Sequence, residues 1–234
     1  MAAGPADRTP RRAWADLRVR ALSALVLAPL VLAAIWAGGT VFYAFVGVVA
    51  LGLAYEWAGL CRAGRWPRES LVLGIAAVGL WAVALGWLRA DPLAGRANVI
   101  GLALVVWGSD IGAYVAGRLI GGPRLAPRIS PGKTWAGALG GVTASALIAV
   151  CLATLLIPAP NLRAALAIGA ALSVCGQIGD LAESVAKRRA GVKDSGRLIP
   201  GHGGLLDRLD AVMAAVLAAA ILSLALGRGV VLWQ

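Results

Sequence analysis

The stretch WAGALGGVTASALIAVCLATLLI, residues 135–157, decides the fold, because none of its 23 residues is Asp, Glu, Lys or Arg. The hydrocarbon layer of a membrane is about 30 Å thick, and about 20 apolar residues in an α-helix cross it. A helix also satisfies its own backbone hydrogen bonds, which lipid cannot do. The stretch therefore predicts a membrane-spanning helix.

Similar apolar runs lie on both sides of this stretch. Together they predict seven helices, near residues 21–37, 41–60, 71–88, 98–119, 135–157, 164–181 and 211–226. Of the 234 residues, 60% are hydrophobic and 14% are charged, against about 45–50% and 25% in an ordinary soluble domain. The composition predicts an all-α polytopic membrane protein with about seven transmembrane helices. We expect a basic cytoplasmic N-terminal arm at residues 1–20 and a single transmembrane domain at 21–234.

The distribution of positive charge predicts the orientation. The formal net charge is +11, and in a membrane protein this favours anionic lipid or phosphate as partners, not nucleic acid. The segments 1–20, 61–70, 118–133 and 183–210 carry 5, 3, 4 and 6 Lys or Arg residues, which is 18 of the 22 in the chain. By the positive-inside rule these segments are cytoplasmic. The N-terminus is then inside and, with seven spans, the C-terminus is outside.

Glycines at a spacing of four residues predict close contacts between helices. The pairs are Gly108/Gly112, Gly117/Gly121 and Gly137/Gly141. Small residues at this spacing let two helix backbones approach each other in lipid. We expect these pairs to serve packing alone.

A carboxylate, Asp110, lies within the predicted fourth helix, in the segment VVWGSDIGAYVAGRLIGG. A charged residue at membrane depth costs free energy, so an intramembrane Asp indicates a functional site. The alternative is an Asp that is hydrogen-bonded between packed helices.

A second polar group lies in LAPRISPGKTWAG, on a segment broken by Pro and Gly that is expected to be a loop entering the fifth helix. Its members are Arg124, Arg128, Ser130, Lys133 and Thr134. A helix N-terminus with an adjacent Lys and Ser or Thr suits phosphate. The segment contains the GKT of a Walker A loop, but Pro127 stands in place of the first glycine and no strand is expected before it. The alternative is a basic loop that only fixes topology.

The third polar group is GDLAESVAKRRAGVKDSGRLIPGHGGLLDRLD, residues 179–210. If the sixth helix continues through it, four side chains at i, i+3, i+4 and i+7 share one face. They are Asp180, Glu183, Ser184 and Lys187. Asp207 and Asp210 follow at i and i+3 on the start of the last helix, so two helix ends present facing carboxylates.

The segment between these helix ends carries Lys193, Asp194 and His202. Carboxylate ligands without Cys or further His fit Mg²⁺, which binds through one or two carboxylates plus substrate phosphates. Glycines at 201, 203 and 204 permit close approach of the backbone to phosphate. The alternatives are a solvated, salt-bridged loop and a structural role for His202.

These segments resemble the phosphatidate cytidylyltransferase family, also called CDP-diacylglycerol synthases. The family signature falls on Ser184, Lys187, Arg188, Lys193, Asp194, His202, Gly203, Gly204, Asp207, Arg208 and Asp210. The segments SDIGAYVAGRLIG, RISPGKTWAG, GDLAES and Tyr55-Glu56-Trp57 also look like the family's. The chain departs from the family pattern at Ala186, Gly132 and Ala136, and it is short between the third and fourth spans.

The resemblance implies transfer of a cytidylyl group from CTP to phosphatidic acid, which gives CDP-diacylglycerol and pyrophosphate for phospholipid biosynthesis. It makes 21–234 a catalytic domain in the cell (inner) membrane, with a polar active site facing the cytoplasm, and it leaves a homodimer open. The implied cofactor is Mg²⁺ on Asp180 and Asp207, with Glu183 and Asp210 as further ligands or supports.

The resemblance also implies the remaining site residues. Catalytic residues would be Asp180, Asp207, Asp210, Lys187, His202 and Asp110. Substrate-binding residues would be Ser130, Lys133, Thr134, Ser184, Arg188, Lys193, Asp194, Gly203, Gly204 and Arg208.

Two other classes of function remain as alternatives. A transporter of an anionic solute would also use an intramembrane Asp and broken helices, but it would show inverted repeats, and we find none. Another lipid enzyme would be a CTP-dependent lipid kinase or an alcohol phosphotransferase that consumes CDP-diacylglycerol. The DG-x-x-AR motif expected of the phosphotransferase is missing from the sequence.

Overall fold

The fold is a bundle of apolar helices, seen in a computed structural model that describes residues 25–199, 203–227 and 231–233. Its long helices are α2 (Gly39–Ala63), α3 (Arg68–Arg89), α4 (Gly95–Leu119), α5 (Trp135–Leu156), α6 (Leu162–Arg189) and α7 (Leu206–Leu226). A shorter apolar helix, Leu25–Ala37, precedes α2. All six long helices are long and apolar enough to cross a membrane. The chain is thus an all-α polytopic membrane protein, as predicted.

The predicted helices are present, and two of them extend into polar sequence. The sixth helix, expected near 164–181, continues to Arg189, so the condition for Asp180, Glu183, Ser184 and Lys187 to share one face is met. Its last turn carries three basic residues, which suit the negative end of the helix dipole. The last helix begins at Leu206, so Asp207 lies in its first turn, as expected. The predicted arm at 1–20 and the first four residues of the predicted first helix lie outside the described residues.

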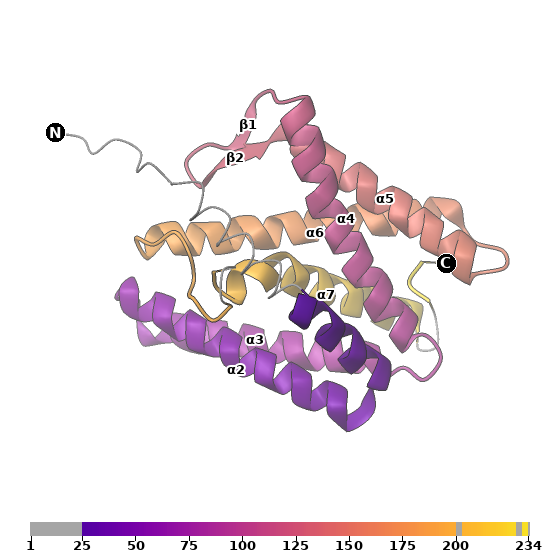
Figure 1. Ribbon diagram of the computed structural model, residues 1–234, viewed down its shortest axis with the longest axis horizontal. Coiled ribbons are helices and arrows are strands. Elements are labelled where there is room, and N and C mark those ends of the chain that lie inside the picture. The colour runs from indigo at the N-terminus through magenta and orange to yellow at the C-terminus, as the bar shows by residue number, and fades with distance from the viewer. Residues whose placement is uncertain (1–24, 200–202, 228–230, 234) are drawn as a thin grey trace.

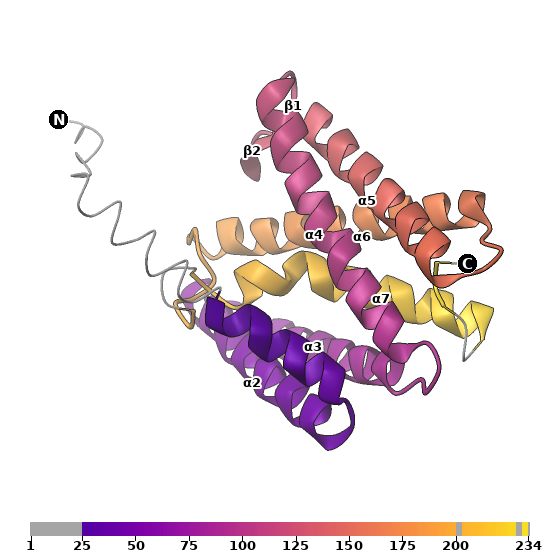
Figure 2. The same ribbon diagram turned by 45° about the vertical axis from the view of Figure 1, so that its right-hand side comes forward.

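Short connections make consecutive helices antiparallel, so the bundle has two ends (Figures 1 and 2). The end that holds the α4–α5 and α6–α7 connections is called the site end below. Among the described residues, the Lys and Arg residues at the opposite end are Arg89, Arg96 and Arg163. The described part of the C-terminal segment also lies at that end, where the Leu232 N–H donates to Asn98 Oδ1 at 2.8 Å. The two ends therefore differ strongly in charge.

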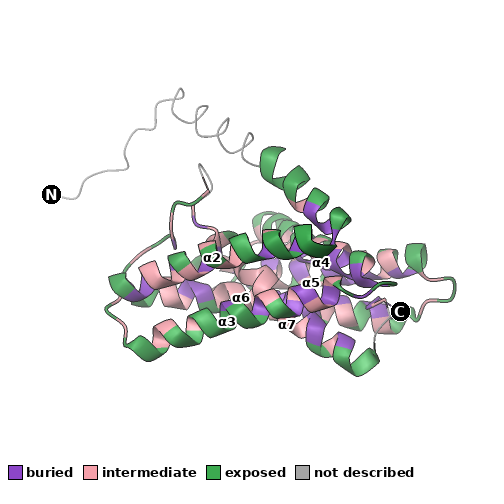
Figure 3. Ribbon diagram, turned by 90° about the horizontal axis from the view of Figure 1, so that it is seen from below, coloured by how far each residue is buried: buried purple, intermediate pink, exposed green. Residues whose placement is uncertain are grey.

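The outside of the bundle is apolar and part of its inside is polar. Leu51, Leu73 and Leu80 are among the large apolar side chains that are exposed, and Figure 3 shows exposed residues along the outer faces of α2 and α3. Ser145 and Ser173, in contrast, are buried between helices. Lipid contact outside and hydrogen bonding inside are what a membrane bundle requires.

Helices α4 and α5 pack closely through glycine. A Cβ atom on Gly112 would lie 2.7 Å from the carbonyl oxygen of Gly140, and one on Gly137 would lie 2.8 Å from that of Ala113. The predicted packing of Gly108/Gly112 and Gly137/Gly141 is thus confirmed, since these glycines all lie against the facing helix. The prediction for Gly121 is wrong. Helix α4 has ended before it, its φ is +68°, and no atom lies within 4 Å of the position of a Cβ, so Gly121 serves the chain reversal.

The segment expected to be a loop before the fifth helix is an antiparallel hairpin. Strand β1 (Arg124–Ala126) pairs with β2 (Ser130–Thr134), and Arg124 lies opposite Thr134. The expectation that no strand precedes GKT is therefore wrong, but GKT itself lies in β2. A phosphate-binding loop follows its strand and opens a helix, so the extended GKT segment is not a Walker A loop. Thr134 caps α5 instead, because its hydroxyl accepts from the Gly137 N–H at 3.0 Å.

Close packing at Gly112 makes a stability prediction. Gly112→Val places a branched side chain against the backbone of α5, and overpacking of this kind costs about 1–3 kcal/mol. We expect the Tm of the detergent-purified variant to fall by several degrees. Gly79→Val is the matched control, since Gly79 is exposed in α3 with no atom within 4 Å of a Cβ. Equal melting of the two variants would contradict the packing.

Candidate active site

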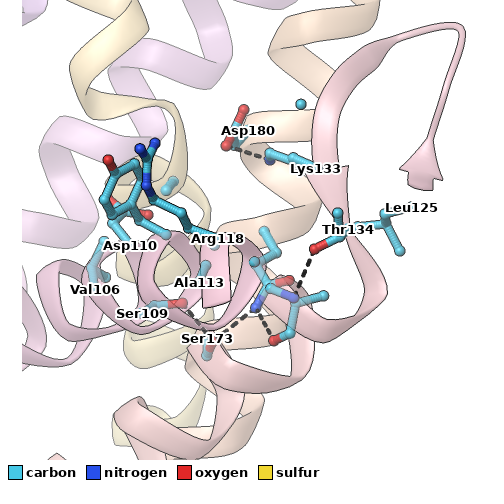
Figure 4. A pocket seen from close by; sticks show the side chains of 18 of the residues that line it. Val106, Ser109, Asp110, Ala113, Arg118, Leu125, Lys133, Thr134, Ser173 and Asp180 are labelled. Atoms are coloured by element: carbon cyan, nitrogen blue, oxygen red, sulfur yellow. Dashed lines mark hydrogen bonds and ion pairs between the residues drawn. The ribbon is translucent and has the colours of Figure 1, made fainter. Parts of the chain in front are cut away.

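A cavity of about 430 Å³ opens at the site end of the bundle. Asp110 and Arg118 of α4, Lys133 of β2, Asp180 of α6 and Ala211 of α7 are among the residues that line it (Figure 4). With Leu125 of β1 and Gly137 of α5, six elements converge on one cavity, although they are spread over about half of the chain. The cavity combines two cations and two carboxylates with apolar residues and uncharged polar side chains such as Ser109 and Gln177.

Hydrogen bonds between side chains tie the helices together beside this cavity. Ser109 Oγ and Ser173 Oγ lie 2.7 Å apart, which joins α4 to α6. The Gln177 side-chain N–H₂ group donates to Ser173 Oγ and to the Ala138 carbonyl oxygen, both at 3.1 Å, which joins α6 to α5. The polar face of α6 that the sequence indicates from Asp180 onward therefore begins two turns earlier.

Lys133 and Asp180 form an ion pair across the cavity, between β2 and α6 (Figure 4). Their side chains are 27% and 33% exposed. A pair this accessible contributes little to stability. Both groups are therefore available to a charged ligand that enters the cavity.

Lys187 lies between two carboxylates from neighbouring helices. Its Nζ is 2.5 Å from Glu183 Oε2 in α6 and 2.7 Å from Asp207 Oδ1 in α7. The three side chains are only 5–13% exposed. The expected meeting of carboxylates from two helix ends is confirmed, and it takes place around a lysine.

Asp207 also organises the segment that connects α6 to α7. Its Oδ2 accepts from the Ser195 and Gly204 backbone N–H groups, each at 3.0 Å. Gly203 has a φ of +84°, a conformation that favours glycine. Its carbonyl oxygen accepts from the Ile199 N–H at 3.1 Å. The sequence reasoning expects these glycines to approach phosphate, and the described structure shows them shaping the turn around Asp207.

Asp210 lies close to Asp180, because α6 and α7 approach each other at Gly179. A Cβ on Gly179 would be 2.7 Å from the carbonyl oxygen of Asp210. Asp110 and Asp180 line the same cavity, and Asp210 directly precedes Ala211, which lines it too. Three helices thus each bring one carboxylate to the same region.

A family model described as the cytidylyltransferase family matches residues 65–226. This range includes every residue that lines the cavity, the Lys187 cluster and the connection around Gly203. The chain belongs to the cytidylyltransferase family. This family match begins in the connection between α2 and α3 and runs to the end of α7.

Several curated proteins are similar over most of the chain. A phosphatidate cytidylyltransferase of Brucella suis biovar 1 (strain 1330) is 36% identical over 249 residues, covering 86% of this chain and 90% of the relative. One of Rickettsia bellii (strain RML369-C) is 33% identical, covering 85% of this chain and 87% of the relative. One of Pseudomonas aeruginosa is 41% identical, covering 71% of this chain and 60% of the relative.

The site residues predicted for this cytidylyltransferase-family chain fall into three groups. The cavity is lined by Asp110, Lys133, Thr134 and Asp180. Next to it lie Ser184, whose hydroxyl is 3.5 Å from Asp180 Oδ1, and the cluster of Glu183, Lys187 and Asp207.

The third group lies toward the surface of the site end. Arg188 Nε donates to the Ile129 carbonyl oxygen at 3.2 Å and so ties α6 to the hairpin. Ser130 begins β2 and is half-buried, whereas Lys193, Asp194 and Arg208 are exposed. His202 lies outside the described residues. The substrate-binding roles of these residues stay predictions.

Among the polar cavity-lining residues that the sequence analysis does not single out are Arg118 and Gln177. Arg118 follows Asp110 by two helical turns, so it lies on the same side of α4. Gln177 precedes Asp180 by three residues on α6, a spacing that also places two side chains on one face. Extending each polar face by one or two turns would have found both.

The carboxylates around the cavity fit a magnesium ion that substrate phosphates complete. Among the described residues, no group of three or more His, Cys, Asp or Glu could hold a metal by itself. Mg²⁺ normally needs only one or two carboxylates besides water and phosphate. Asp180 and Asp210 supply two hard-oxygen groups where α6 and α7 approach each other at Gly179, and a cation there would offset their like charges. The Glu183 and Asp207 carboxylates contact Lys187 in this structure, and their role as ligands stays a prediction.

The Lys187 cluster makes a stability prediction. Lys187→Met leaves two buried carboxylates facing each other, and breaking a buried pair costs about 3–5 kcal/mol. We expect a clear fall in Tm, partly restored when Glu183→Gln is added because one of the two unpaired charges is then removed. The exposed Lys193→Met provides the control. If Lys187→Met has the same Tm as this control, the ion pairs of the cluster do not stabilise the fold.

Proposed function

We propose that the chain transfers a cytidylyl group from CTP to phosphatidic acid, giving CDP-diacylglycerol and pyrophosphate. The observation that carries the proposal is the polar cavity at the charged end of the bundle, with Lys133 paired to Asp180 across it. Relatives that cover most of the chain bear the name phosphatidate cytidylyltransferase. Both substrates are anions, and the cavity supplies cations at the membrane boundary where a lipid phosphate lies.

The reaction needs positioning and charge neutralisation. An oxygen of the phosphatidic acid phosphate attacks the α-phosphorus of CTP, the bond from this phosphorus to the bridging oxygen of the β-phosphate breaks, and pyrophosphate leaves. Aligning two reactants and stabilising developing charge supply most of the rate in such transfers. Lys133 and Arg118 approach the cavity from two sides, so they can hold phosphate oxygens.

The N-terminus of α5 adds to this phosphate-binding environment. It follows Lys133 directly, and its Gly137 N–H is already capped by Thr134. The positive end of the helix dipole still favours an anion near Lys133. Thr134 therefore shapes the site through the start of the helix.

We propose Asp180 and Asp210 as the residues that would hold Mg²⁺. When bound, the ion would neutralise phosphate oxygens and favour departure of pyrophosphate. Asp180 would then exchange its contact with Lys133 for the ion, which frees Lys133 for a phosphate of the substrate. Lys187 keeps the nearby Glu183 and Asp207 charges paired in the described structure.

The proposed location is the cell (inner) membrane, with the site end in the cytoplasm. The support is the charge difference between the two ends, which has the sign that the positive-inside rule requires.

After replacement of the native cysteines, Arg65→Cys should react with a membrane-impermeant reagent only from the cytoplasmic side. Leu93→Cys, at the opposite end, should react only from outside, and the reverse pattern would overturn the orientation. A homodimer stays a prediction.

The function is tested with purified protein, labelled CTP, Mg²⁺ and phosphatidic acid. We expect labelled CDP-diacylglycerol and pyrophosphate. A phosphorylated lipid would indicate a kinase instead.

Lys133→Ala should lower kcat/KM by roughly 10²-fold, the size expected for loss of a charged group that stabilises a transition state. Arg128→Ala removes the same charge from the exposed turn of the same hairpin and should act like the wild type. Wild-type kinetics for Lys133→Ala would mean that the RISPGKT segment only helps to fix the membrane orientation.

The metal assignment is tested by Asp→Asn substitutions, which remove a charge at nearly constant volume. Asp180→Asn should abolish most turnover, and Asp210→Asn should raise the Mg²⁺ concentration needed for half-maximal activity. Asp207→Asn should also lower activity, because it releases Lys187 and the backbone of Ser195 and Gly204. A folded Asp180→Asn variant with wild-type turnover and unchanged Mg²⁺ dependence would defeat the assignment. If only Asp207→Asn changes the Mg²⁺ dependence, the second ligand is Asp207.

A further inference from the structure

Glu56 is a buried carboxylate that the proposed mechanism does not use. It lies in α2, is only 3% exposed, and falls outside residues 65–226 that match the family model. It does not line the cavity. Burying a carboxylate among membrane helices is unfavourable unless hydrogen bonds or charges compensate it. Its partners therefore indicate why it is there.

The partners of Glu56 all belong to the α6–α7 connection and the start of α7. Its Oε2 accepts from Ser195 Oγ at 3.0 Å and from the Leu206 N–H at 2.8 Å. Leu206 is the first residue of α7, and its N–H is one of the donors that a helix start leaves without an intrahelical partner. A side chain of α2 thus caps a helix that begins 150 residues later in the sequence.

The backbone of the connection closes around this carboxylate. A Cβ on Gly204 would lie 2.7 Å from Glu56 Oε2, and one on Gly196 would collide with Oε1. Glycine at 196 thus leaves room for Glu56, and glycine at 204 leaves room for Glu56, the Ser195 hydroxyl and the Gly196 backbone. Ordinary side chains at these positions would push the connection away from α2.

Ser195 links Glu56 to the Lys187 cluster. Its hydroxyl donates to Glu56, while its backbone N–H donates to Asp207 Oδ2 at 3.0 Å. Asp207 in turn contacts Lys187. Two carboxylates, one from α2 and one from α7, therefore hold the same residue from opposite sides.

We propose that Glu56 is a positioning residue for the cytidylyl transfer. It fixes where α7 begins, and with it the placement of Asp207, Asp210 and the cavity-lining Ala211 against α6. It acts through Ser195 and Leu206 and does not touch the reacting phosphates. This inference rests on the proposed function for its kinetic consequence, whereas its structural consequence is measurable without any substrate.

The test compares Glu56→Gln with Glu69→Gln, the same substitution at an exposed position in the first turn of α3. We expect Glu56→Gln to lower kcat/KM by about tenfold, as for loss of one charge-assisted hydrogen bond. In the absence of substrate, trypsin should cleave the connection at the exposed Lys193 or Arg197 several-fold faster than in the wild type. Glu69→Gln should match the wild type in both measurements.

If Glu56→Gln does not fold, the variant Ser195→Ala tests the positioning role of Glu56 in its place. Ser195→Ala removes one donor to Glu56 without adding bulk, so it should shift both measurements in the same direction by a smaller amount. In the folded double variant the two effects should be less than additive, since both act on one contact.

Two outcomes would overturn the inference. The first is unchanged trypsin cleavage and unchanged kcat/KM in folded Glu56→Gln. The second is a lower Tm with unchanged kcat/KM per folded molecule, which would make Glu56 a stability residue only. If the wild type makes no CDP-diacylglycerol, the proposed function fails instead, and the cleavage comparison still decides whether Glu56 holds the connection.

Discussion

A carboxylate inside a bundle of membrane helices must find a cation or hydrogen-bond donors, because neither lipid nor apolar packing can compensate its charge. This constraint organises the site end of the molecule. Glu183 and Asp207 share Lys187, Asp180 takes Lys133, and Glu56 takes Ser195 and Leu206. The contacts of Lys133 with Asp180 and of Glu56 with Ser195 and Leu206 join elements that are distant in the sequence, and the contact of Lys187 with Asp207 joins the consecutive helices α6 and α7. The polar contacts therefore help to determine how the apolar helices are placed.

The resulting site contains charged groups in two different settings. The Lys187 cluster is buried, so its ion pairs hold α6 and α7 together. The Lys133–Asp180 pair is about one-third exposed at the cavity, so a charged ligand can replace it. A rigid cluster beside an exchangeable pair suits an enzyme that must bind two anions without letting its helices separate. The glycines between α4 and α5 and at Gly179 bring the helices close enough for both arrangements.

Much of this architecture follows from local sequence patterns. Uninterrupted apolar runs predict the helices. The spacing of Asp180, Glu183, Ser184 and Lys187 puts them on one face if the sixth helix continues past 181, and α6 does continue to Arg189. The sequence does not predict the hairpin, because Pro127 and Gly132 mark a break in the chain without specifying which strands pair. Gly121 was misassigned because a spacing of four residues does not show where a helix ends.

The contacts of Glu56 show the limit of such patterns. Nothing near Glu56 in the sequence indicates that its partners are Ser195 and Leu206, 139 and 150 residues away. Likewise, the sequence places Asp207 and Glu183 near each other, but the position of Lys187 between them depends on how α6 and α7 are rotated. Long-range packing therefore decides which carboxylates are engaged and which face the cavity.

The central claim is that the cavity between Lys133 and Asp180 is the nucleotide site. A structure of the protein in lipid nanodiscs with Mg²⁺ and a non-hydrolysable CTP analogue tests it most directly. We expect the triphosphate in this cavity, with Lys133 separated from Asp180 and an ion beside the Asp180 carboxylate. A nucleotide bound elsewhere, for example in the pocket beside Arg89 and Arg96 at the opposite end, with the Lys133–Asp180 pair intact, would contradict it.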